Sequence, residues 1–426
     1  MYMDSVLNIV KKLLPKSVFQ FFQPYYHLAL AWWGAVKYQH PSREITIIAV
    51  TGTKGKSTTT ELIAQILRGS GKKVASLSTI QFVIGDKVER NMFKMTTPGR
   101  FFVQRFLRQA VDAGCTYAVL EMSSEGARQF RHRFIDFDAL VFTNLSPEHI
   151  ESHGSFEKYK AAKLSIAKAV SKSAKQPCVI VANTDDQYGG EFLAVPADKR
   201  IPYGLGDLSL HTLQKDGITL VLKGITIRVP IVGLFNVYNT LAALKVAEVF
   251  GVSLETAAEA LRTLKPIAGR VEQFHSSIQA TKQVTAVVDY AHTVDSLEKL
   301  YQAFPDKPLV CVLGNTGGGR DTWKRPEMAA IAEKYCTHII LTNEDPYDED
   351  PRKIIADMVK GMSSTEKLSI IMDRTEAIRT AISLAPNGGY VLVSGKGTDP
   401  YIMEGNGKKT PWSDAEVVKR LLAEVT

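Results

Sequence analysis

A glycine-rich loop between a strand-like and a helix-like segment most constrains this chain. The loop reads Thr-Gly-Thr-Lys-Gly-Lys-Ser over Thr51–Ser57, after the apolar run Ile45–Val50. Such a loop points backbone N–H groups and a helix N-terminus at one place, where phosphate binds. Lys56 adds a positive charge there, and Ser57 can offer a hydroxyl to Mg²⁺. We therefore predict an ATP or GTP site, although Val50 replaces the first glycine of the strict motif; the alternative is a tight turn with a surface lysine.

Length and composition are typical of a soluble protein with two or three domains, each with its own core. The net charge of +8 permits anionic partners such as nucleotides or phospholipid headgroups. Basic and acidic residues are interleaved, so we do not expect nucleic-acid binding. The four cysteines show no zinc or redox spacing, which predicts buried free thiols in a reducing cytosol; they are Cys115, Cys178, Cys311 and Cys336.

The first 44 residues differ from the rest of the chain. Val6–Leu14 has apolar residues at helical spacing, and a group of aromatic residues follows between Phe19 and Trp33. The apolar piece Leu28–Val36 is too short to cross a bilayer, which takes about 20 residues. Five basic residues stand against two acidic ones. We expect either an amphipathic helix in the membrane interface, or a helical arm packed on the protein's own body or on a second copy.

From Ile45 onward, strand-like runs alternate with amphipathic helical ones, such as 98–113 and 156–171. This order predicts an α/β fold with parallel sheets covered by helices. The expected strands are 118–121, 139–142, 179–182, 284–289, 309–313, 339–342 and 390–394. Residues 208–233 instead alternate over shorter runs around a Lys223-Gly224 turn, which predicts a small β insertion or an edge hairpin.

A predicted hinge divides the chain after two helical stretches, 237–250 and 254–263. Pro266 and Gly269 interrupt the helical pattern, and a new strand is expected from Val271. We therefore predict three parts: an aromatic arm over 1–44, a central ATP-binding domain over 45–268 and a C-terminal α/β domain over 269–426.

Polar residues follow two of the expected strands. Glu121 ends one strand, and the polar turn after Phe142 ends with His149. The carboxyl ends of parallel strands meet at one edge of a sheet, near a phosphate loop, where a Mg²⁺ ligand belongs. Either residue alone is weak support, but together they predict one metal-binding crevice.

Lys163 lies in an apolar helix stripe. It is spaced three and four residues from Phe156, Tyr159, Ile166 and Val170, which together define one helix face. A lysine buried there would lose its charge readily, because desolvation lowers its pKa. A neutral amine can take up CO₂ as a carbamate, an anion able to bind a cation. The alternative is that the long side chain reaches solvent.

These motifs, in this order, resemble the Mur ligase family, the ATP-dependent amino-acid-adding enzymes of peptidoglycan synthesis, and most of all its MurE type. The family's T-G-T-x-G-K-[ST] loop matches Thr51–Ser57, F-T-N-L-x-x-[DE]-H matches Phe142–His149, and H-G-x4-Y-x-x-A-K matches His153–Lys163. Further family motifs match Glu121 with Ser123 and Ser124, and the segments 235–239, 269–272, 289–293, 319–326, 373–378 and 395–397. The resemblance implies a P-loop ATPase domain followed by a Rossmann-like ligase domain.

The resemblance also implies a reaction: ATP phosphorylates a carboxylate, and an amine attacks the acyl phosphate to leave an amide, ADP and phosphate. Lys56, Glu121, His149 and Lys163 would be catalytic. Of two Mg²⁺ ions, one would be held by Ser57 and Glu121, and the other by His149 and N6-carboxylated Lys163. The expected ATP contacts are Gly52, Thr53, Lys54, Gly55, Lys56, Ser57, Thr58, Asn236, Asn239, Arg270, Asp289 and His292.

On the substrate side, the resemblance implies that the muramyl peptide contacts Thr96, Thr97, Ser123, Gln129 and Arg131, with Arg320 as a further substrate residue. The chain departs from the MurE pattern at its start, because MurE proteins have an N-terminal domain of about 90 residues that binds the uridine nucleotide. Here 44 residues precede the loop domain. Recognition of a UDP-sugar is therefore in doubt, and we expect a lipid-linked or otherwise reduced muramyl peptide handled at a membrane surface.

The amino-acid motif also departs from the family. The D-N-P-R of diaminopimelate enzymes reads Glu344-Asp345-Pro346-Tyr347, and G-K-G-H-E becomes Gly395–Asp399. Without the arginine fork for a distal carboxylate, the pocket is acidic and suits lysine or another diamine. We expect a cytoplasmic enzyme, with 1–44 as its candidate contact to the inner face of the membrane. The alternatives are a folylpolyglutamate synthetase-like or other Mur-fold ligase, and a nucleotide-dependent scaffold without catalysis.

Overall fold

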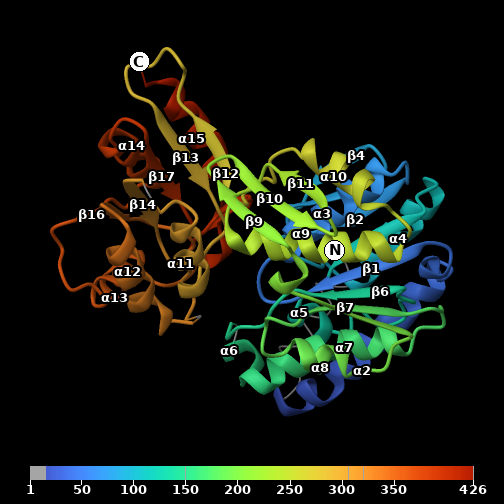
Figure 1. Cartoon of the computed structure of the whole chain (residues 1–426). Coiled ribbons are helices and arrows are strands. Elements are labelled where there is room, and N and C mark those ends of the chain that lie inside the picture. The colour runs from blue at the N-terminus through green and yellow to red at the C-terminus, as the bar shows by residue number, and fades with distance from the viewer. Residues whose placement is uncertain (1–15, 149, 306, 320, 426) are drawn as a thin grey trace.

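Two mostly parallel sheets, each covered by helices, organise the chain (Figure 1). The structure is a computed structural model, and it describes residues 16–148, 150–305, 307–319 and 321–425. The helices lie on both faces of each sheet, so the apolar strands are buried on both sides. The predicted α/β class with parallel sheets is confirmed.

The larger sheet has eight strands. They are β1 (Thr46–Thr51), β2 (Val74–Leu77), β3 (Gln81–Ile84), β4 (Lys87–Arg90), β5 (Tyr117–Glu121), β6 (Ala139–Phe142), β7 (Val179–Asn183) and β8 (Lys199–Tyr203). Their order is β4-β3-β2-β5-β1-β6-β7-β8. Strand β1 lies between β5 and β6 and is parallel to both. The carboxyl ends of these three strands therefore meet at one edge, as predicted for Glu121 and the turn after Phe142.

Alternate residues of β1 face two separate cores. Ile48 and Val50 pack with one group of helices, and Ile47 and Ala49 pack with the other. The first group is α3 (Lys56–Gly69), α9 (Leu234–Val249) and α10 (Leu254–Arg262). The second is α4 (Arg100–Asp112), α5 (Ser124–Arg128), α7 (Phe156–Ser171) and α8 (Gly189–Leu193), with α6 (Ile150–His153) packed on α7.

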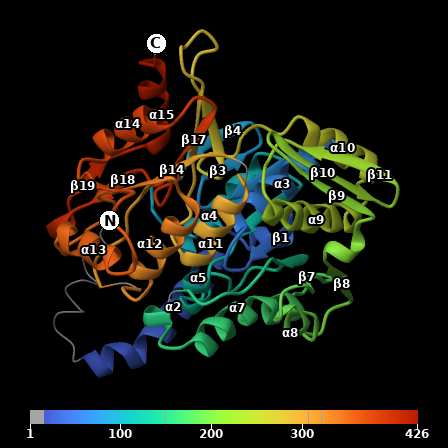
Figure 2. The same cartoon turned by 60° about the vertical axis from the view of Figure 1, so that its left-hand side comes forward.

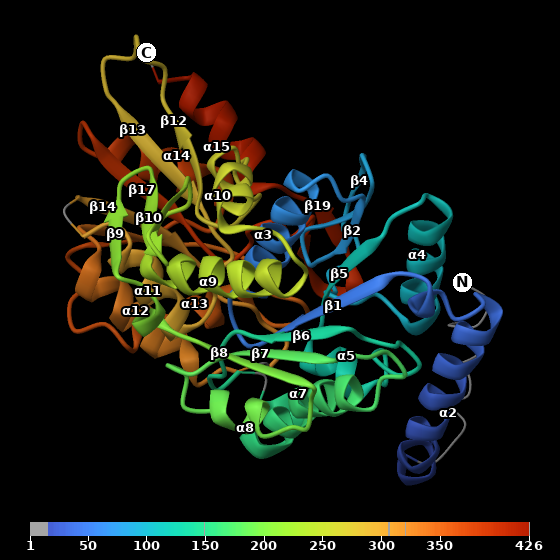
Figure 3. The ribbon, with the colours of Figure 1, turned by 45° about the vertical axis from the view of Figure 1, so that its right-hand side comes forward.

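The segment predicted as a β insertion or an edge hairpin forms its own antiparallel sheet of β9 (Leu210–Gln214), β10 (Gly217–Leu222) and β11 (Ile225–Val229). The predicted turn is present, with Lys223 and Gly224 both at positive φ. The sheet packs against α10, and Figures 2 and 3 show it at the opposite end of the larger sheet from α2 (Lys16–Lys37).

The smaller sheet has six strands, in the order β12-β13-β17-β14-β15-β16. They are β12 (Glu272–His275), β13 (Val284–Val288), β14 (Leu309–Leu313), β15 (His338–Leu341), β16 (Leu368–Ile370) and β17 (Gly389–Val393). One face is covered by α11 (Val294–Gln302), α12 (Lys324–Tyr335) and α13 (Pro351–Val359), the other by α14 (Arg374–Leu384) and α15 (Asp414–Ala423). A ribbon of β18 (Tyr401–Met403) and β19 (Lys409–Pro411) follows β17. Short 3-10 turns span Pro41–Arg43, Leu205–Asp207 and Gly405–Gly407.

The expectation of four free thiols is wrong for one pair. Cys311 of β14 and Cys336 at the end of α12 form a disulfide, with Cα atoms 6.1 Å apart. Helix α12 returns the chain beside the strand it left, which brings together two cysteines 25 residues apart. Sequence periodicity gives no sign of this pairing. Cys115 and Cys178 are free and buried, as predicted.

Helix α2 packs along α4 at the edge of the molecule (Figure 3). Ala31 and Ala35 are buried in this contact, and the Trp33 ring meets the Phe101 ring edge-on at 5.4 Å. The described part of the arm, from Lys16 onward, therefore lies on the protein's own body, which was one of the expected arrangements. The predicted helical stretch Val6–Leu14 lies outside the described residues. No helix in the described part of the chain is long and apolar enough to cross a bilayer.

Candidate active site

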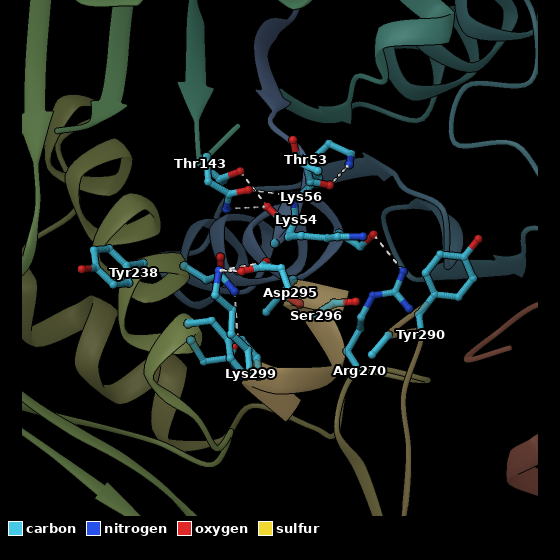
Figure 4. A pocket seen from close by; sticks show the side chains of 18 of the residues that line it. Thr53, Lys54, Lys56, Thr143, Tyr238, Arg270, Tyr290, Asp295, Ser296 and Lys299 are labelled. Atoms are coloured by element: carbon cyan, nitrogen blue, oxygen red, sulfur yellow. Dashed lines mark hydrogen bonds and ion pairs between the residues drawn. The ribbon is translucent and has the colours of Figure 1, made fainter. Parts of the chain in front are cut away.

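A cavity of about 700 Å³ lies between the two sheets. The loop after β1 forms one wall, and residues before and after β13 form another. Figure 4 shows Thr53 and Lys56 on one side and Asp295, Ser296 and Arg270 on the other. Except for His149, which lies outside the described residues, all the residues predicted to be catalytic line this cavity.

The loop that follows β6 is hydrogen-bonded to the phosphate loop. The Thr53 amide donates to the Asn144 carbonyl at 2.8 Å, and the Thr143 hydroxyl donates to the Lys54 carbonyl at 2.7 Å. Gly55 has φ 80°, and a Cβ there would lie 2.2 Å from Asn239 Oδ1. Glycine is therefore required both by the backbone conformation and by the close approach of α9.

Lys56 folds back over the loop, where its Nζ donates to the Thr53 carbonyl at 2.8 Å. Burial lowers the pKa of Lys56, while the carboxylates of Glu121 and Glu148 oppose this shift. An anionic phosphate would supply the compensating charge that the buried ammonium needs.

Ser57 and Glu121 meet as the sequence predicts. The Ser57 hydroxyl donates to Glu121 Oε2 at 2.9 Å, and the Thr79 amide donates to the same oxygen at 2.7 Å. Arg270 approaches from the second half of the chain, with Nη2 3.3 Å from Ser57 Oγ. A hydroxyl and a carboxylate are hard oxygen donors of the kind Mg²⁺ prefers, so these residues fit the predicted ion on ATP.

Lys163 is buried, as its place in the apolar stripe predicts. Its side chain does not reach solvent, because the residue is only 1% exposed and Nζ donates to the Gly52 carbonyl at 2.6 Å. Lys163 Nζ lies over the Tyr159 ring, 4.8 Å from its centre. Burial, and then the nearby charge of Lys56, hold the pKa of Lys163 well below its usual range. The site therefore favours a neutral amine.

Glu148 links the two halves of the cavity. Its Oε1 lies 2.8 Å from Lys54 Nζ and 3.0 Å from His292 Nε2. Burial and the charge of Lys54 lower the pKa of His292 to about 4, which leaves the ring neutral at pH 7. His292 Nδ1 lies 2.6 Å from the Tyr290 carbonyl, so the neutral ring can donate to one of its two acceptors at a time. Glu148 belongs to the matched segment Phe142–His149, but no role was predicted for it.

The predicted nucleotide residues of α9 and the β12–β13 region also meet here. Asn239 donates to Asn236 Oδ1 at 2.9 Å, and the Arg270 guanidinium lies over the Tyr290 ring at 4.7 Å. Asp289 accepts from the amides of Val271 and Ala291, at 2.8 and 2.7 Å. Asp289 therefore lines the cavity while both its oxygens hold the surrounding backbone. Tyr290 lies within the matched segment 289–293, but no role was predicted for it.

The predicted acceptor residues lie next to this loop. Thr96 and Ser123 line the cavity. Thr97 Oγ1 donates to the Glu121 carbonyl at 3.2 Å, and Arg131 joins the Thr97 carbonyl to Gln129 Oε1. The structure thus brings all five residues together on one side of Glu121.

The predicted amino-acid pocket contains its acids, but also two lysines that sequence reasoning did not assign to it. Lys94 Nζ lies 2.7 Å from Asp345 Oδ2 and 3.1 Å from Asp399 Oδ2. Lys396 Nζ lies 2.8 Å from the other Asp345 oxygen. The pocket is therefore less acidic than expected, because two ammonium groups offset much of its negative charge. Lys94 was missed because it is 251 residues from Asp345 in sequence.

Three other residues predicted for this pocket, Glu344, Gly395 and Tyr347, lie in the described part of the chain. Glu344 is buried and accepts from Thr316 Oγ1 at 3.0 Å, and burial raises the pKa of Glu344. A Cβ at Gly395, which has φ 103°, would lie 2.3 Å from Glu344 Oε2. Tyr347 is anchored by its amide, which donates to the Met403 carbonyl at 3.0 Å. Arg320 lies outside the described residues.

Comparison with known proteins gives consistent matches. The Mur ligase middle domain matches residues 50–247, and the domain described as "Mur ligase, glutamate ligase domain" matches 269–397. The UDP-N-acetylmuramoyl-L-alanyl-D-glutamate--2,6-diaminopimelate ligase of Syntrophomonas wolfei is 37% identical over 390 residues, covering 88% of this chain and 77% of that protein. The UDP-N-acetylmuramyl-tripeptide synthetase of a Roseiflexus species is 36% identical over 429 residues, covering 94% and 83%.

Solved structures show the same relationship. One of a UDP-N-acetylmuramoyl-L-alanyl-D-glutamate--2,6-diaminopimelate ligase aligns with a TM-score of 0.60 at 30% identity, over 89% of this chain and 78% of that one. Folylpolyglutamate synthase of Mycobacterium tuberculosis, complexed with ADP, aligns with a TM-score of 0.69 over 86% and 91%, but at 18% identity it shows the shared fold alone.

Proposed function

The chain belongs to the Mur ligase family and is an ATP-dependent ligase, and we propose that it joins a diamino acid to the carboxylate of a muramyl-peptide-type acceptor in peptidoglycan precursor synthesis. One observation carries this proposal: Lys56, the Ser57–Glu121 pair and the buried amine of Lys163 meet in one cavity. Thr96 and Ser123, the predicted acceptor residues, line the same cavity. Because the reaction consumes ATP, we propose the cytoplasm as its location.

The reaction must bring an anionic carboxylate to the anionic γ-phosphate of ATP. The carboxylate takes the phosphoryl group and releases ADP; the amine then attacks the acyl carbon, and phosphate leaves as the amide forms. Lys56 and Arg270 supply positive charge on the phosphate side. Ser57 and Glu121 would hold Mg²⁺, which would neutralise charge on the phosphates.

In our proposal, Lys163 supplies a negative charge that binds a second Mg²⁺. Its neutral amine would add to CO₂, forming an N–C bond and releasing one proton, so that Lys163 becomes an N6-carboxylate. This anion and His149 would hold a second Mg²⁺ beside the acceptor carboxylate. The support is chemical: a buried amine with a lowered pKa is the form that reacts with CO₂.

Contacts between the two halves of the chain would keep water from the acyl phosphate. Arg270 reaches Ser57, His292 reaches Glu148, and Lys94 reaches Asp345 and Asp399. These contacts surround the cavity from both sheets. Water that entered would hydrolyse the intermediate before the amine attacked it.

We propose a diamino acid because the pocket already holds a primary ammonium between two carboxylates. Lys94 Nζ occupies the place between Asp345 and Asp399 that the distal ammonium of lysine or ornithine would take. Tyr347 stands where an arginine would grip a distal carboxylate in the diaminopimelate motif. In our proposal the substrate displaces Lys94 and takes over its two partners.

Phosphate release from ATP tests the function. The purified chain is incubated with Mg²⁺-ATP and muramyl dipeptide acceptors, with and without a uridine nucleotide or lipid carrier, each crossed with lysine, ornithine, diaminopimelate and glutamate. We expect release that requires both an acceptor and a diamino acid, with the amide product seen by mass spectrometry. Tetrahydrofolate with glutamate is the control for a folylpolyglutamate synthetase-like activity. ATP binding without turnover in every combination would contradict the proposal and favour a scaffold.

A further inference from the structure

Helix α2 has an apolar face whose side chains are exposed, although Trp33 at its edge also meets the Phe101 ring. Its inner face, with Ala31 and Ala35, packs on α4. On the opposite side lie residues spaced as one helix stripe, which we call the outer face: Phe22, Tyr25, Ala29, Trp32, Trp33 and Val36. All six are exposed, with Trp32 at 54%. Contiguous exposed apolar residues of this kind mark an interaction surface.

We propose that the outer face binds the surface of an anionic phospholipid bilayer. Tryptophan and tyrosine are enriched where a protein meets the boundary between headgroups and acyl chains. Because no helix in the described part of the chain is long and apolar enough to cross a bilayer, α2 would lie in the interface plane. This surface is separate from the ligase cavity, and none of the six residues lines that cavity.

Charge favours lipid over a second copy of the chain. The sequence contains no aspartate or glutamate from Ser5 to Arg43, whereas this stretch contains several basic residues. Lys37 Nζ lies 6.0 Å from the centre of the Phe101 ring, and the Arg105 guanidinium lies 5.4 Å from that of Phe102. Two copies meeting through α2 would bring these positive charges together, whereas anionic headgroups would neutralise them.

The aromatic surface continues toward the acceptor side of the active site. Trp33 contacts Phe101, and the next residue on α4, Phe102, contacts Phe93 at 5.3 Å between ring centres. Phe93 is 48% exposed and precedes the Thr96-Thr97 turn by three residues. If the proposed function holds, an acceptor anchored in the same bilayer would therefore reach the cavity from this side.

Vesicle co-sedimentation of the full chain tests the proposal without ATP, acceptor or amino acid. The vesicles are phosphatidylcholine alone, or phosphatidylcholine with phosphatidylglycerol. The W32E/V36E variant places two charges on the outer face, and I278E is the matched control, because Ile278 is 94% exposed on the distant β12–β13 hairpin. We expect the chain to bind anionic vesicles at least about tenfold more tightly than neutral ones, with weaker binding at high salt.

W32E/V36E should lose at least about tenfold in vesicle affinity, and I278E should bind like the unchanged chain. ATP affinity, measured in parallel, should be the same for all three and shows that the variants are folded. Absent binding of the unchanged chain, or equal binding of W32E/V36E, would overturn the proposal. A concentration-dependent dimer in ultracentrifugation that W32E/V36E abolishes would overturn it in favour of a second copy. None of these outcomes depends on the ligase reaction.

Discussion

Replacing Lys94 by methionine tests how this protein selects its amino acid. Lys94 belongs to the first half of the chain, but its ammonium lies between Asp345 and Asp399 of the second half. All three side chains are mostly buried, and Lys94 is 16% exposed. Burial lowers the pKa of Lys94, but the two carboxylates outweigh it and raise the pKa above its ordinary value. Methionine has similar length and removes only the charge and the donors.

The expected size follows from the contacts. A hydrogen bond between charged groups contributes a net of about 1.5–3 kcal/mol. A substrate ammonium that takes this place must first displace Lys94, so its apparent affinity is reduced by about 10- to 150-fold. Lys94→Met removes the competitor, and Asp345 keeps its contact with Lys396. We expect the KM for L-lysine to fall about tenfold or more, while the KM for ATP stays unchanged.

Steady-state phosphate release with varied L-lysine measures this effect. Lys94→Arg, which keeps the positive charge, should not lower the KM, and Lys87→Met controls for loss of an exposed lysine paired with Glu89 on β4. A higher KM for L-lysine in Lys94→Met would refute the reasoning. Equal loss of kcat for every amino acid would instead show that Lys94 only ties the two halves of the chain together.

Three further predictions concern the buried amine of Lys163 and the stability of the fold. Lys163→Ala should reduce kcat by at least about 10²–10³-fold, because it removes the amine that we propose carries the carboxylate at the reacting centre. In ¹³CO₂, a carbamate NMR signal should be present in the unchanged chain and absent in the variant, and its absence from both would contradict the carboxylation. Asp414→Ala should destabilise the protein by about 3–5 kcal/mol in urea unfolding, because it leaves the Arg374 guanidinium, 1% exposed, buried without its carboxylate partner; a loss below about 1 kcal/mol would show that Arg374 finds another partner. Burial lowers the pKa of His132 from 6.5 to about 4, so the unfolded chain binds this proton more readily than the folded chain. The free energy of unfolding should therefore be highest above pH 6.5 and decrease by up to about 3 kcal/mol as the pH falls to 4. His132→Phe should reduce this acid sensitivity, and an unchanged pH profile would exclude His132 as its source.

The local sequence pattern alone predicted many of the helices and strands of this protein. The boundaries predicted for the helix 156–171 are those observed for α7, and the predicted strands 118–121 and 139–142 lie within β5 and β6. The same periodicity placed Lys163 in a buried stripe but left open whether its side chain reaches solvent. Such features could be predicted because side-chain spacing of 2 or 3.6 residues reports which face of an element is buried. The glycine loop was equally local, since its backbone conformation and its helix are contiguous in sequence.

Only the tertiary structure decided which distant residues meet. The Cys311–Cys336 disulfide, the contacts of Lys94 with Asp345 and Asp399, and the pairing of Glu148 with His292 join separate elements. The same is true of α2, whose two apolar faces are equivalent in sequence until one of them packs on α4. Periodicity records the direction of a side chain but not the element it faces, which depends on how the whole chain packs.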